Sequence, residues 1–441
     1  MNDNKSHATA AFACVTTLFF AWGFVTSIID PLIPAVKSVF TLNYAESMLT
    51  QFAWFIAYGL VSLPAAALLA RLGFVVSIIV ALVAMVLGCL LVPVATMLDA
   101  YPGVLLALFV IASGVTLLQV AANPLVAVLG APERSHFRLT FSQAFNSLGT
   151  VIGPYLGATI MLSGGLFGAG PDAGAGRTET LRSIDTQFIL VASFFAALAI
   201  FIWLVRSRIR AAAPTAQDAV APWRAFGSGW ALFGGVAIFL YVGAEVAIAS
   251  IMINFLVHIE FHTFLARLGF VDALARAGLI DPASTPEEIA GKTLGLCYWG
   301  GAMIGRFVGS WLLTKVNAGA LLAIAASITT VLCVVVSQAS GPAGGVAALS
   351  IGFFNSIMFP TIFTLTLARS SAPTSAVSGL LCMAIVGGAV IPPLTGATAD
   401  ALGVGLAFLV PAGAYLGVIA FAAARAKPVS ARAATASIVG H

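Results

Sequence analysis

Carboxamide side chains recur within two long apolar stretches of the sequence, where a side chain that needs hydrogen bonds is costly. Gln119 and Asn123 are four residues apart, and Gln143 and Asn146 are three apart, so each pair shares one face of a helix. Each carboxamide offers both donors and an acceptor. The set favours a neutral ligand rich in hydroxyl groups over an ion, which would call for charge. For any one of these residues, the alternative is a hydrogen bond between helices.

Asp30 is an acid inside the first apolar stretch, preceded by FFAWGFVTSII and followed by PLIP. Ionised Asp at mid-membrane depth costs about 2.5–3.5 kcal/mol, so such acids usually have a function. The alternative is a carboxylate that a neighbouring helix satisfies. Because apolar surroundings favour the neutral carboxyl group, Asp30 can gain a proton from one side of a membrane and lose it to the other. Thr26 and Ser27 lie one turn before it.

The second half of the chain contributes Glu245, Arg306 and Asn355 to the polar side chains at membrane depth. Glu245 and Arg306 lie on consecutive apolar stretches, and an ion pair between them is the simplest way to bury both charges. The alternative for these two residues is substrate contact or proton coupling. Five aromatic residues offer apolar faces to a sugar ring, or else pack between helices: Trp22, Tyr58, Tyr241, Tyr298 and Trp299.

The composition is that of an integral membrane protein. Of the 441 residues, 60% are hydrophobic and only 8% are charged, and the mean hydropathy is +1.06. Soluble domains carry about 25% charged residues. The apolar runs reach 20 residues or more, the length of a membrane-spanning helix, whereas barrel strands need only about ten. We therefore predict an all-α membrane protein.

Breaks between the apolar runs predict twelve membrane-spanning helices, and an even count places both termini on one side. Most of the 20 Lys and Arg residues lie on the side of the N-terminus, which predicts that both termini are cytoplasmic. The predicted spans are 9–34, 46–70, 74–97, 102–129, 139–163, 186–205, 230–257, 292–314, 318–337, 344–368, 375–398 and 403–424.

The spans form two halves joined by a basic segment rich in Ala and Pro. We predict an N-terminal six-helix bundle over 1–206, a cytoplasmic linker over 207–229 and a C-terminal six-helix bundle over 230–441. The halves repeat, because three pairs match in the same order: Arg71 with Lys315, Gln119-x4-Pro124 with Asn355-x4-Pro360, and Gly149–Thr159 with Gly388–Thr398. Such pseudo-symmetric bundles are typical of transporters, in which they rock about a site near the midplane.

The segment 258–291 lies on the opposite side, and its FLARLGFVDALARAGL predicts one short amphipathic helix near the membrane interface. His258, Glu260 and His262 fit solvated residues better than a zinc site. The five cysteines lie far apart inside apolar runs, a pattern of small buried residues with neither metal-ligand spacing nor a disulfide framework.

Enzyme motifs are missing from the sequence: it has no HExxH, no G-x-S-x-G, no P-loop and no run of nucleotide-binding glycines. We therefore expect no enzyme activity, no catalytic or metal-binding residues and no cofactor. An ion gradient is a simpler source of energy for this chain than ATP.

Long motifs extend over nearly the whole chain: FFAWGFVTSIIDPLIP, ASGVTLLQVAANPLVAVLG, RLTFSQAFNSLGT, FLYVGAEV, GRFVGSWL and FFNSIMFPTIFTLTLARS. Together they resemble the fucose–proton symporter family of the major facilitator superfamily, and within it the glucose/galactose and N-acetylglucosamine transporter branch. The resemblance implies the major facilitator fold and a sugar–proton symporter of the bacterial inner membrane that works by alternating access.

The resemblance also assigns roles to individual residues. Asp30 matches the acid that takes the proton in the family's fucose transporters, and Gln143 and Asn146 match amides that contact sugar. The fucose branch has a second acid in the fourth helix, where this chain has Gln119.

Other positions depart from the family as well. Thr26 and Ser27 stand where the fucose branch has a pair of Asn. The superfamily's loop motif after the second helix is degenerate: ALLARLGFVV keeps Arg71 and Gly73 but lacks the acid before the Arg and the basic pair after it.

The Gln119 departure leaves three ways to couple transport to a gradient. Asp30 alone links proton and sugar, or Glu245 has taken the second role, or sodium replaces the proton. We favour Asp30 alone.

We therefore expect a monomeric importer of a neutral hexose or amino-hexose (glucose, galactose or N-acetylglucosamine) that lies in the lipid bilayer, is driven by protons and has no nucleic-acid partner. The expected proton-coupling residues are Asp30 and Glu245, and the expected substrate-binding residues are Gln119, Gln143, Asn146, Asn123, Ser27, Trp22, Tyr241 and Asn355. The alternatives are a sodium-coupled or uniport sugar transporter, an exporter of drugs or metabolites on the same scaffold, and a sugar sensor. Sensors usually carry a sizeable soluble output domain, whereas the tail after Arg425 is short.

Overall fold

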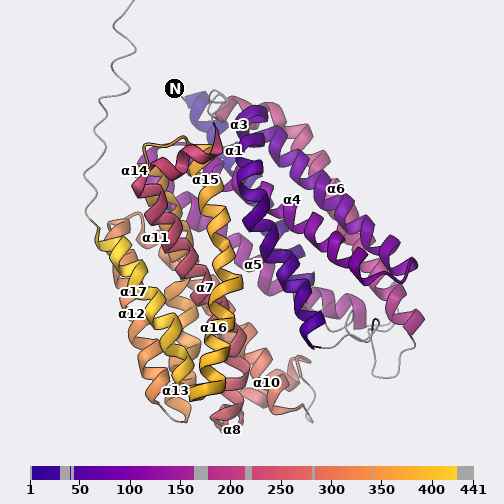
Figure 1. Cartoon of the computed structure of the whole chain (residues 1–441), viewed down its shortest axis with the longest axis vertical. Coiled ribbons are helices and arrows are strands. Elements are labelled where there is room, and N and C mark those ends of the chain that lie inside the picture. Colours follow the sequence, from indigo (N-terminus) through magenta and orange to yellow (C-terminus); the bar gives the residue numbers. More distant parts are fainter. Residues whose placement is uncertain are drawn as a thin grey trace, which may run out of the picture.

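The computed structural model of the chain describes residues 2–29, 40, 44–162, 177–213, 221–280, 284–339 and 341–424. Within these residues the molecule consists of helices in two bundles (Figure 1). Asp30 lies outside the described residues, as does part of the predicted linker.

The N-terminal bundle is built from long helices: α1 (Asn2–Ile29), α3 (Tyr44–Met97), α4 (Tyr101–Val128), α5 (Ser135–Leu162) and α6 (Arg177–Ala212). Its connections contain the 3₁₀ helices η1 (Pro132–Arg134) and η2 (Pro222–Gly227). Two predicted spans follow each other within α3, and a kink at Gly73 divides them. The φ of 73° and ψ of 173° at this glycine are non-helical.

The C-terminal bundle contains more and shorter helices. Its membrane-spanning elements are α7 (Gly229–His258), η3 (Leu294–Trp299), α11 (Gly300–Leu312), α12 (Ala318–Gln338), α13 (Pro342–Asn355), α14 (Met358–Arg369), α15 (Thr374–Met383), η4 (Ala384–Val386), α16 (Gly387–Leu402), η5 (Leu406–Phe408) and α17 (Leu409–Ala423). Between α7 and η3 lie α8 (Phe261–Arg267), α9 (Phe270–Arg276) and α10 (Pro286–Thr293).

The predicted membrane spans correspond to these helices. By length and composition, eight helices among the described residues are able to cross a membrane. The first, Phe52–Met97, contains two predicted spans, and each of the others matches one. The remaining predicted spans correspond to α1, α5 and the segment formed by η3 and α11. The predicted all-α fold of two six-helix bundles is therefore confirmed.

Among the eight helices for which a membrane-length window is described, the fourth helix of each half is the most enclosed by protein. The most apolar windows of α4 and of the α13–α14 segment are 72% buried, whereas those of α6 and α12 are 28% and 33% buried. Buried helices keep their polar side chains away from lipid, and outer helices present apolar ones to it. The repeat thus places Gln119, Asn123 and Asn355 on inner helices.

Proline frees one backbone carbonyl in α4. Pro124 has no N–H, so the carbonyl of Val120, four residues earlier, loses its intrahelical partner. Ser378 of α15, in the other bundle, donates its hydroxyl to Val120 O at 2.8 Å. A carbonyl that lipid cannot satisfy is therefore satisfied across the bundle interface.

The tenth predicted span shows the same effect at Pro360, and here the helix breaks. α13 ends at Asn355 and α14 begins at Met358, with a turn between them. The carbonyl that Pro360 leaves free is that of Ser356, and it accepts a hydrogen bond from Arg306 Nε at 3.1 Å. The eighth and eleventh spans also depart from regular α-helix, at the π-helical η3 and the 3₁₀ turn η4.

The prediction of one amphipathic helix within 258–291 is wrong. The structure has two short helices, α8 and α9, because Gly269 between them adopts a left-handed conformation with φ 70° and ψ 11°. A left-handed residue ends the first helix and turns the chain before the second. His262 is half-buried rather than solvated.

The bundles meet at one end of the molecule, which carries η1, η2 and the α14–α15 connection and which we call the linker end. There His136 Nδ1 of α5 and Thr364 Oγ1 of α14 form a hydrogen bond of 2.6 Å. Gly379 of α15 packs so closely on α3 that a Cβ atom would collide with Ala66 and approach the carbonyl of Ser62. Figure 1 shows the bundles close together at this end and diverging toward α8 and α10.

Gly379→Val should drive the bundles apart at the linker end, because its side chain needs space that Ala66 and Ser62 occupy. The measurement is the rate at which a maleimide modifies Cys382, which is buried in α15 near Tyr58 of α3, with the other cysteines replaced. We expect faster modification. Gly413→Val in α17 is the matched control, because no atom lies within 4 Å of a Cβ there. Equal rates in the two variants would contradict the packing described.

Candidate functional site

Gln119 of α4 is held in place by Tyr58 of α3. Gln119 Nε2 donates to Tyr58 Oη at 2.6 Å, and both side chains are buried. This bond fixes the orientation of the carboxamide, and Gln119 Oε1 accepts no hydrogen bond within the described residues. The arrangement presents an oriented acceptor to a ligand hydroxyl.

The two carboxamide pairs come together where α4 meets α5. Gln143 Nε2 of α5 donates to Asn123 Oδ1 of α4 at 3.4 Å, and both residues are buried. Asn123 Nδ2 is buried without a hydrogen-bond partner in the described part of the chain. Asn123 therefore makes a hydrogen bond between helices, which the sequence offers as the alternative to ligand binding, and it retains an unused donor.

Asn146 joins α5 to α1. Its Nδ2 donates to the carbonyl of Phe19 at 3.1 Å. Gly23, one turn further along α1, lies so close that a Cβ atom would collide with the carbonyl and carboxamide of Asn146. Glycine is thus what allows α1 to reach α5 at this point.

The two hydroxyl groups near the end of α1 are occupied by their own helix. Thr26 Oγ1 donates to the carbonyl of Trp22 at 2.9 Å, and Ser27 Oγ donates to the carbonyl of Phe24 at 2.9 Å. Their hydroxyl oxygens remain able to accept. The predicted role of Ser27 in substrate binding stays a prediction, and so does that of Asp30, which lies outside the described residues.

Asn355 repeats in the second bundle what Gln119 does in the first. Its Nδ2 donates to Tyr298 Oη of η3 at 3.0 Å and lies 3.5 Å from Tyr415 Oη of α17. Asn355 Oδ1 is buried and accepts no hydrogen bond within the described residues. In each half, an amide of the fourth helix therefore donates to a tyrosine of the second.

Glu245 and Tyr241 lie one helical turn apart in α7. Glu245 Oε1 and Tyr241 Oη are both buried; the two side chains lie close enough to act on each other, but neither atom meets hydrogen-bond geometry with a described residue. Buried polar atoms are rarely left unpaired in native proteins, and those that are call for an explanation.

Arg306 of α11 reaches across the interface between the bundles. Besides the Ser356 carbonyl, its guanidinium donates from Nη1 to the carbonyl of Gln143 at 3.3 Å and to the hydroxyl of Ser147, both in α5. The sequence predicts an ion pair between Arg306 and Glu245. The two groups lie near enough to attract each other, but they make no direct contact. The guanidinium instead donates to the Ser356 carbonyl, which Pro360 leaves free, and to α5.

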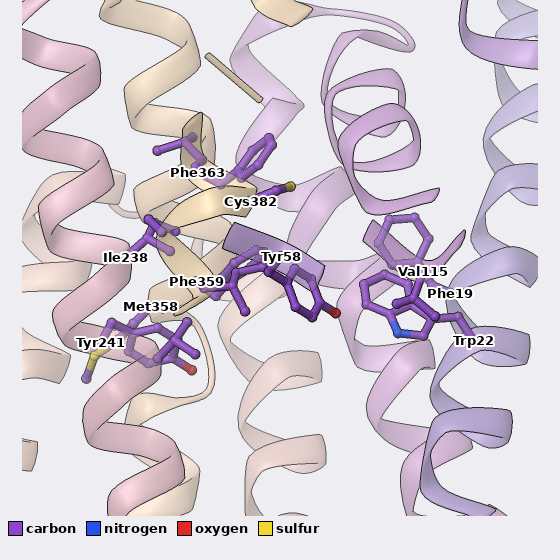
Figure 2. Packing of buried hydrophobic residues seen from close by; sticks show 14 of the residues in the cluster. Phe19, Trp22, Tyr58, Val115, Ile238, Tyr241, Met358, Phe359, Phe363 and Cys382 are labelled. Carbon is purple, nitrogen blue, oxygen red and sulfur yellow. The ribbon is translucent and has the colours of Figure 1, made fainter. Parts of the chain in front are cut away.

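The aromatic residues divide between packing and hydrogen bonding. Trp22 is buried against Phe19, with ring centroids 5.6 Å apart. In Figure 2 the Tyr58 hydroxyl points in the direction of Trp22, away from Phe359 and Phe363 of α14. Tyr58 and Tyr298 accept hydrogen bonds from amides. These bonds use only the hydroxyl groups, and the predicted role of the rings as apolar faces for a sugar stays a prediction.

Sequence reasoning missed two residues of the site. Ser147 contacts Arg306, and it lies four residues after Gln143 on the same helix face, a spacing that would have pointed to it. Tyr415 contacts Asn355 from the last span, and no motif or spacing links the two.

The helical repeat, the two inner fourth helices and the polar contacts between bundles define a major facilitator. The model of the Major Facilitator Superfamily matches residues 15–381, and the chain belongs to this family.

Relatives extend the match to nearly the whole chain. A glucose/galactose transporter of Brucella abortus is 41% identical over 408 residues, which is 91% of this chain and 90% of the relative. The L-fucose-proton symporter of Escherichia coli is 30% identical, over 94% of this chain and 93% of the relative. The crystal structure of the transporter FucP in the outward conformation superposes with a TM-score of 0.78 at 28% identity, covering 94% of this chain and 98% of that one.

Tyr58→Phe should destabilise the protein, because the buried Gln119 N–H would lose its acceptor. A hydrogen bond between membrane helices contributes on the order of 1 kcal/mol, so we expect a lower thermal midpoint in detergent. Thr329→Val in α12 is the control, since the buried Thr329 hydroxyl has no partner among the described residues, and its midpoint should not fall below that of the wild type. Equal midpoints for the two variants would show that the Tyr58 bond contributes nothing.

Proposed function

We propose that this protein imports a neutral hexose or amino-hexose by proton symport and alternating access. The observation that carries the proposal is the set of carboxamides at Gln119, Asn123, Gln143 and Asn146, three of which donate a hydrogen bond to a neighbouring helix. Oriented amides suit a ligand with many hydroxyl groups. The 41% identity to a glucose/galactose transporter and the 30% identity to an L-fucose-proton symporter support this substrate class and this coupling.

In this proposal the two bundles, 1–206 and 230–441, are the moving units, and the linker end faces the cytoplasm of a bacterial cell. The excess of basic residues on that side supports the orientation. In the same proposal, bundles joined at a cytoplasmic linker end make this the outward-facing state, ready to receive sugar from outside. The partners required are the monosaccharide, the proton and the lipid bilayer around a monomer.

Asp30 is the proposed proton carrier, with Glu245 as the second candidate. Gln119, Gln143 and Asn146 bind sugar hydroxyls, helped by Asn123, Ser27, Trp22, Tyr241 and Asn355. Sodium coupling is the alternative, and the sequence offers no carboxylate at the Gln119 position to bind a second cation.

Asp30→Asn should abolish proton-driven sugar accumulation in proteoliposomes, because the amide cannot carry a proton across. Sugar counterflow without a gradient should remain measurable. Asp400→Asn, an exposed acid at the end of α16, is the control and should accumulate sugar as the wild type does. Uphill transport that persists in Asp30→Asn would remove Asp30 from the coupling mechanism.

Gln119→Ala should weaken sugar binding by about tenfold or more, because it removes an oriented acceptor and the donor that fixes it. Equilibrium binding of labelled sugar measures the change. Gln338→Ala, an exposed glutamine at the end of α12, should bind as the wild type. If Gln119→Ala binds sugar with unchanged affinity, Gln119 only joins α4 to α3.

A further inference from the structure

Arg306 is held within its own bundle at Nε, while the rest of its guanidinium contacts other groups. Its Nε is held at 3.1 Å by the Ser356 carbonyl, which Pro360 leaves without an intrahelical donor. This contact lies within the C-terminal bundle, so it persists when the bundles move as units. The other N–H donors of the guanidinium are on its two Nη atoms, which this contact leaves available.

On one side, the guanidinium is bound by the N-terminal bundle. Nη1 donates to the carbonyl of Gln143 and to the hydroxyl of Ser147, both on α5. Phe307, the next residue of α11, packs against Phe141 and Phe145 of α5, with ring centroids 6.1 and 5.9 Å apart. These contacts exist only while α5 and α11 are together.

Glu245 is the acid near the guanidinium, and its buried Oε1 meets hydrogen-bond geometry with no described residue. The titratable or charged groups that act on Glu245 are Tyr241 of its own helix, Tyr298 of η3 and Arg306 of α11. Arg306 is the sole cation of the three. A buried carboxylate whose counter-ion is bound elsewhere is costly, so this arrangement favours a neutral Glu245.

We infer that Arg306 is a positioning residue that exchanges partners between α5 and Glu245, and so links the charge of Glu245 to the contact between the bundles. A neutral Glu245 leaves the guanidinium to α5 and strengthens the contact. A charged Glu245 draws the guanidinium away from Gln143 and Ser147 and weakens it.

The exchange moves one proton and breaks no other covalent bond. When the Glu245 carboxyl group loses its O–H proton to water, the carboxylate gains the guanidinium as its counter-ion, and α5 loses two hydrogen bonds. Reprotonation by water reverses both changes. The site loses one positive charge, which leaves with the proton to water, and the carboxylate that remains is neutralised by Arg306.

This inference rests on the proposed function for the identity of the transported ligand, because the residue whose carbonyl Arg306 binds, Gln143, is also a proposed sugar ligand. Protonation of Glu245 would then favour sugar binding on α5. The exchange itself requires no sugar and can be observed without one.

The test is the distance between spin labels on the two bundles at the linker end, measured by pulsed EPR in nanodiscs at a series of pH values. Labels at Arg134→Cys and Lys315→Cys suit it, because both positions are exposed; the native cysteines are replaced. In the wild type we expect the long-distance population to grow as the pH rises. Glu245→Gln should abolish this response, and Glu245→Asp should restore it.

Ser147→Ala removes one bond between Arg306 and α5 while leaving Glu245 intact. It should raise the long-distance population at every pH by about tenfold, the size expected for one hydrogen bond to a charged group, and keep the pH response. Thr150→Ala, one turn further along α5 and bonded only to its own helix at Asn146 O, is the matched control and should leave the distances unchanged.

Two results would overturn the inference: a wild-type pH response in Glu245→Gln, or wild-type distances in Ser147→Ala. Sugar counterflow on the same wild-type samples tests the proposed function separately, with glucose, galactose, fucose and N-acetylglucosamine as probes. A pH response that Glu245→Gln abolishes, in a protein that moves none of these sugars, would support the exchange and refute the proposed substrate class.

Discussion

A polar group in the middle of a membrane bundle has no water with which to form a hydrogen bond, so the protein itself must supply every partner. The two prolines of the inner helices make this constraint visible. Pro124 frees the Val120 carbonyl and Pro360 frees the Ser356 carbonyl. The first is satisfied by Ser378 of the other bundle and the second by Arg306. Groups that lipid cannot satisfy thus determine where the bundles touch and where a cation lies beside the site.

The same constraint explains the paired amides and tyrosines. A buried carboxamide must be held by a neighbour, and in each half that neighbour is a tyrosine of the second helix, Tyr58 for Gln119 and Tyr298 for Asn355. The pseudo-symmetry of the fold therefore extends to its hydrogen bonds. The symmetry ends at the proline-freed carbonyls, since one is bound across the interface and the other within its own bundle, and in the second half Glu245 and Arg306 lie near each other.

Much of the fold was predictable from the sequence, because apolar runs, the duplication and turn residues act locally. The spans, the repeat and the clustering of Gln119, Asn123, Gln143 and Asn146 followed from spacing. Pro360 and Gly269 are local signals of a helix break and of a left-handed turn. Both were missed because the spans were predicted from the length of the apolar runs. The partners of Arg306 were not predictable, because they depend on how close α5 and α11 lie, and pairing with Glu245 was the simpler expectation without that knowledge.

Sugar and proton should cross the membrane together, and recording the pH outside proteoliposomes when sugar is added without any imposed gradient tests this. A transported hexose or amino-hexose should carry protons inward, so the account predicts a transient alkalinisation of the medium that a protonophore abolishes. Entry of labelled sugar with no change in external pH would contradict it.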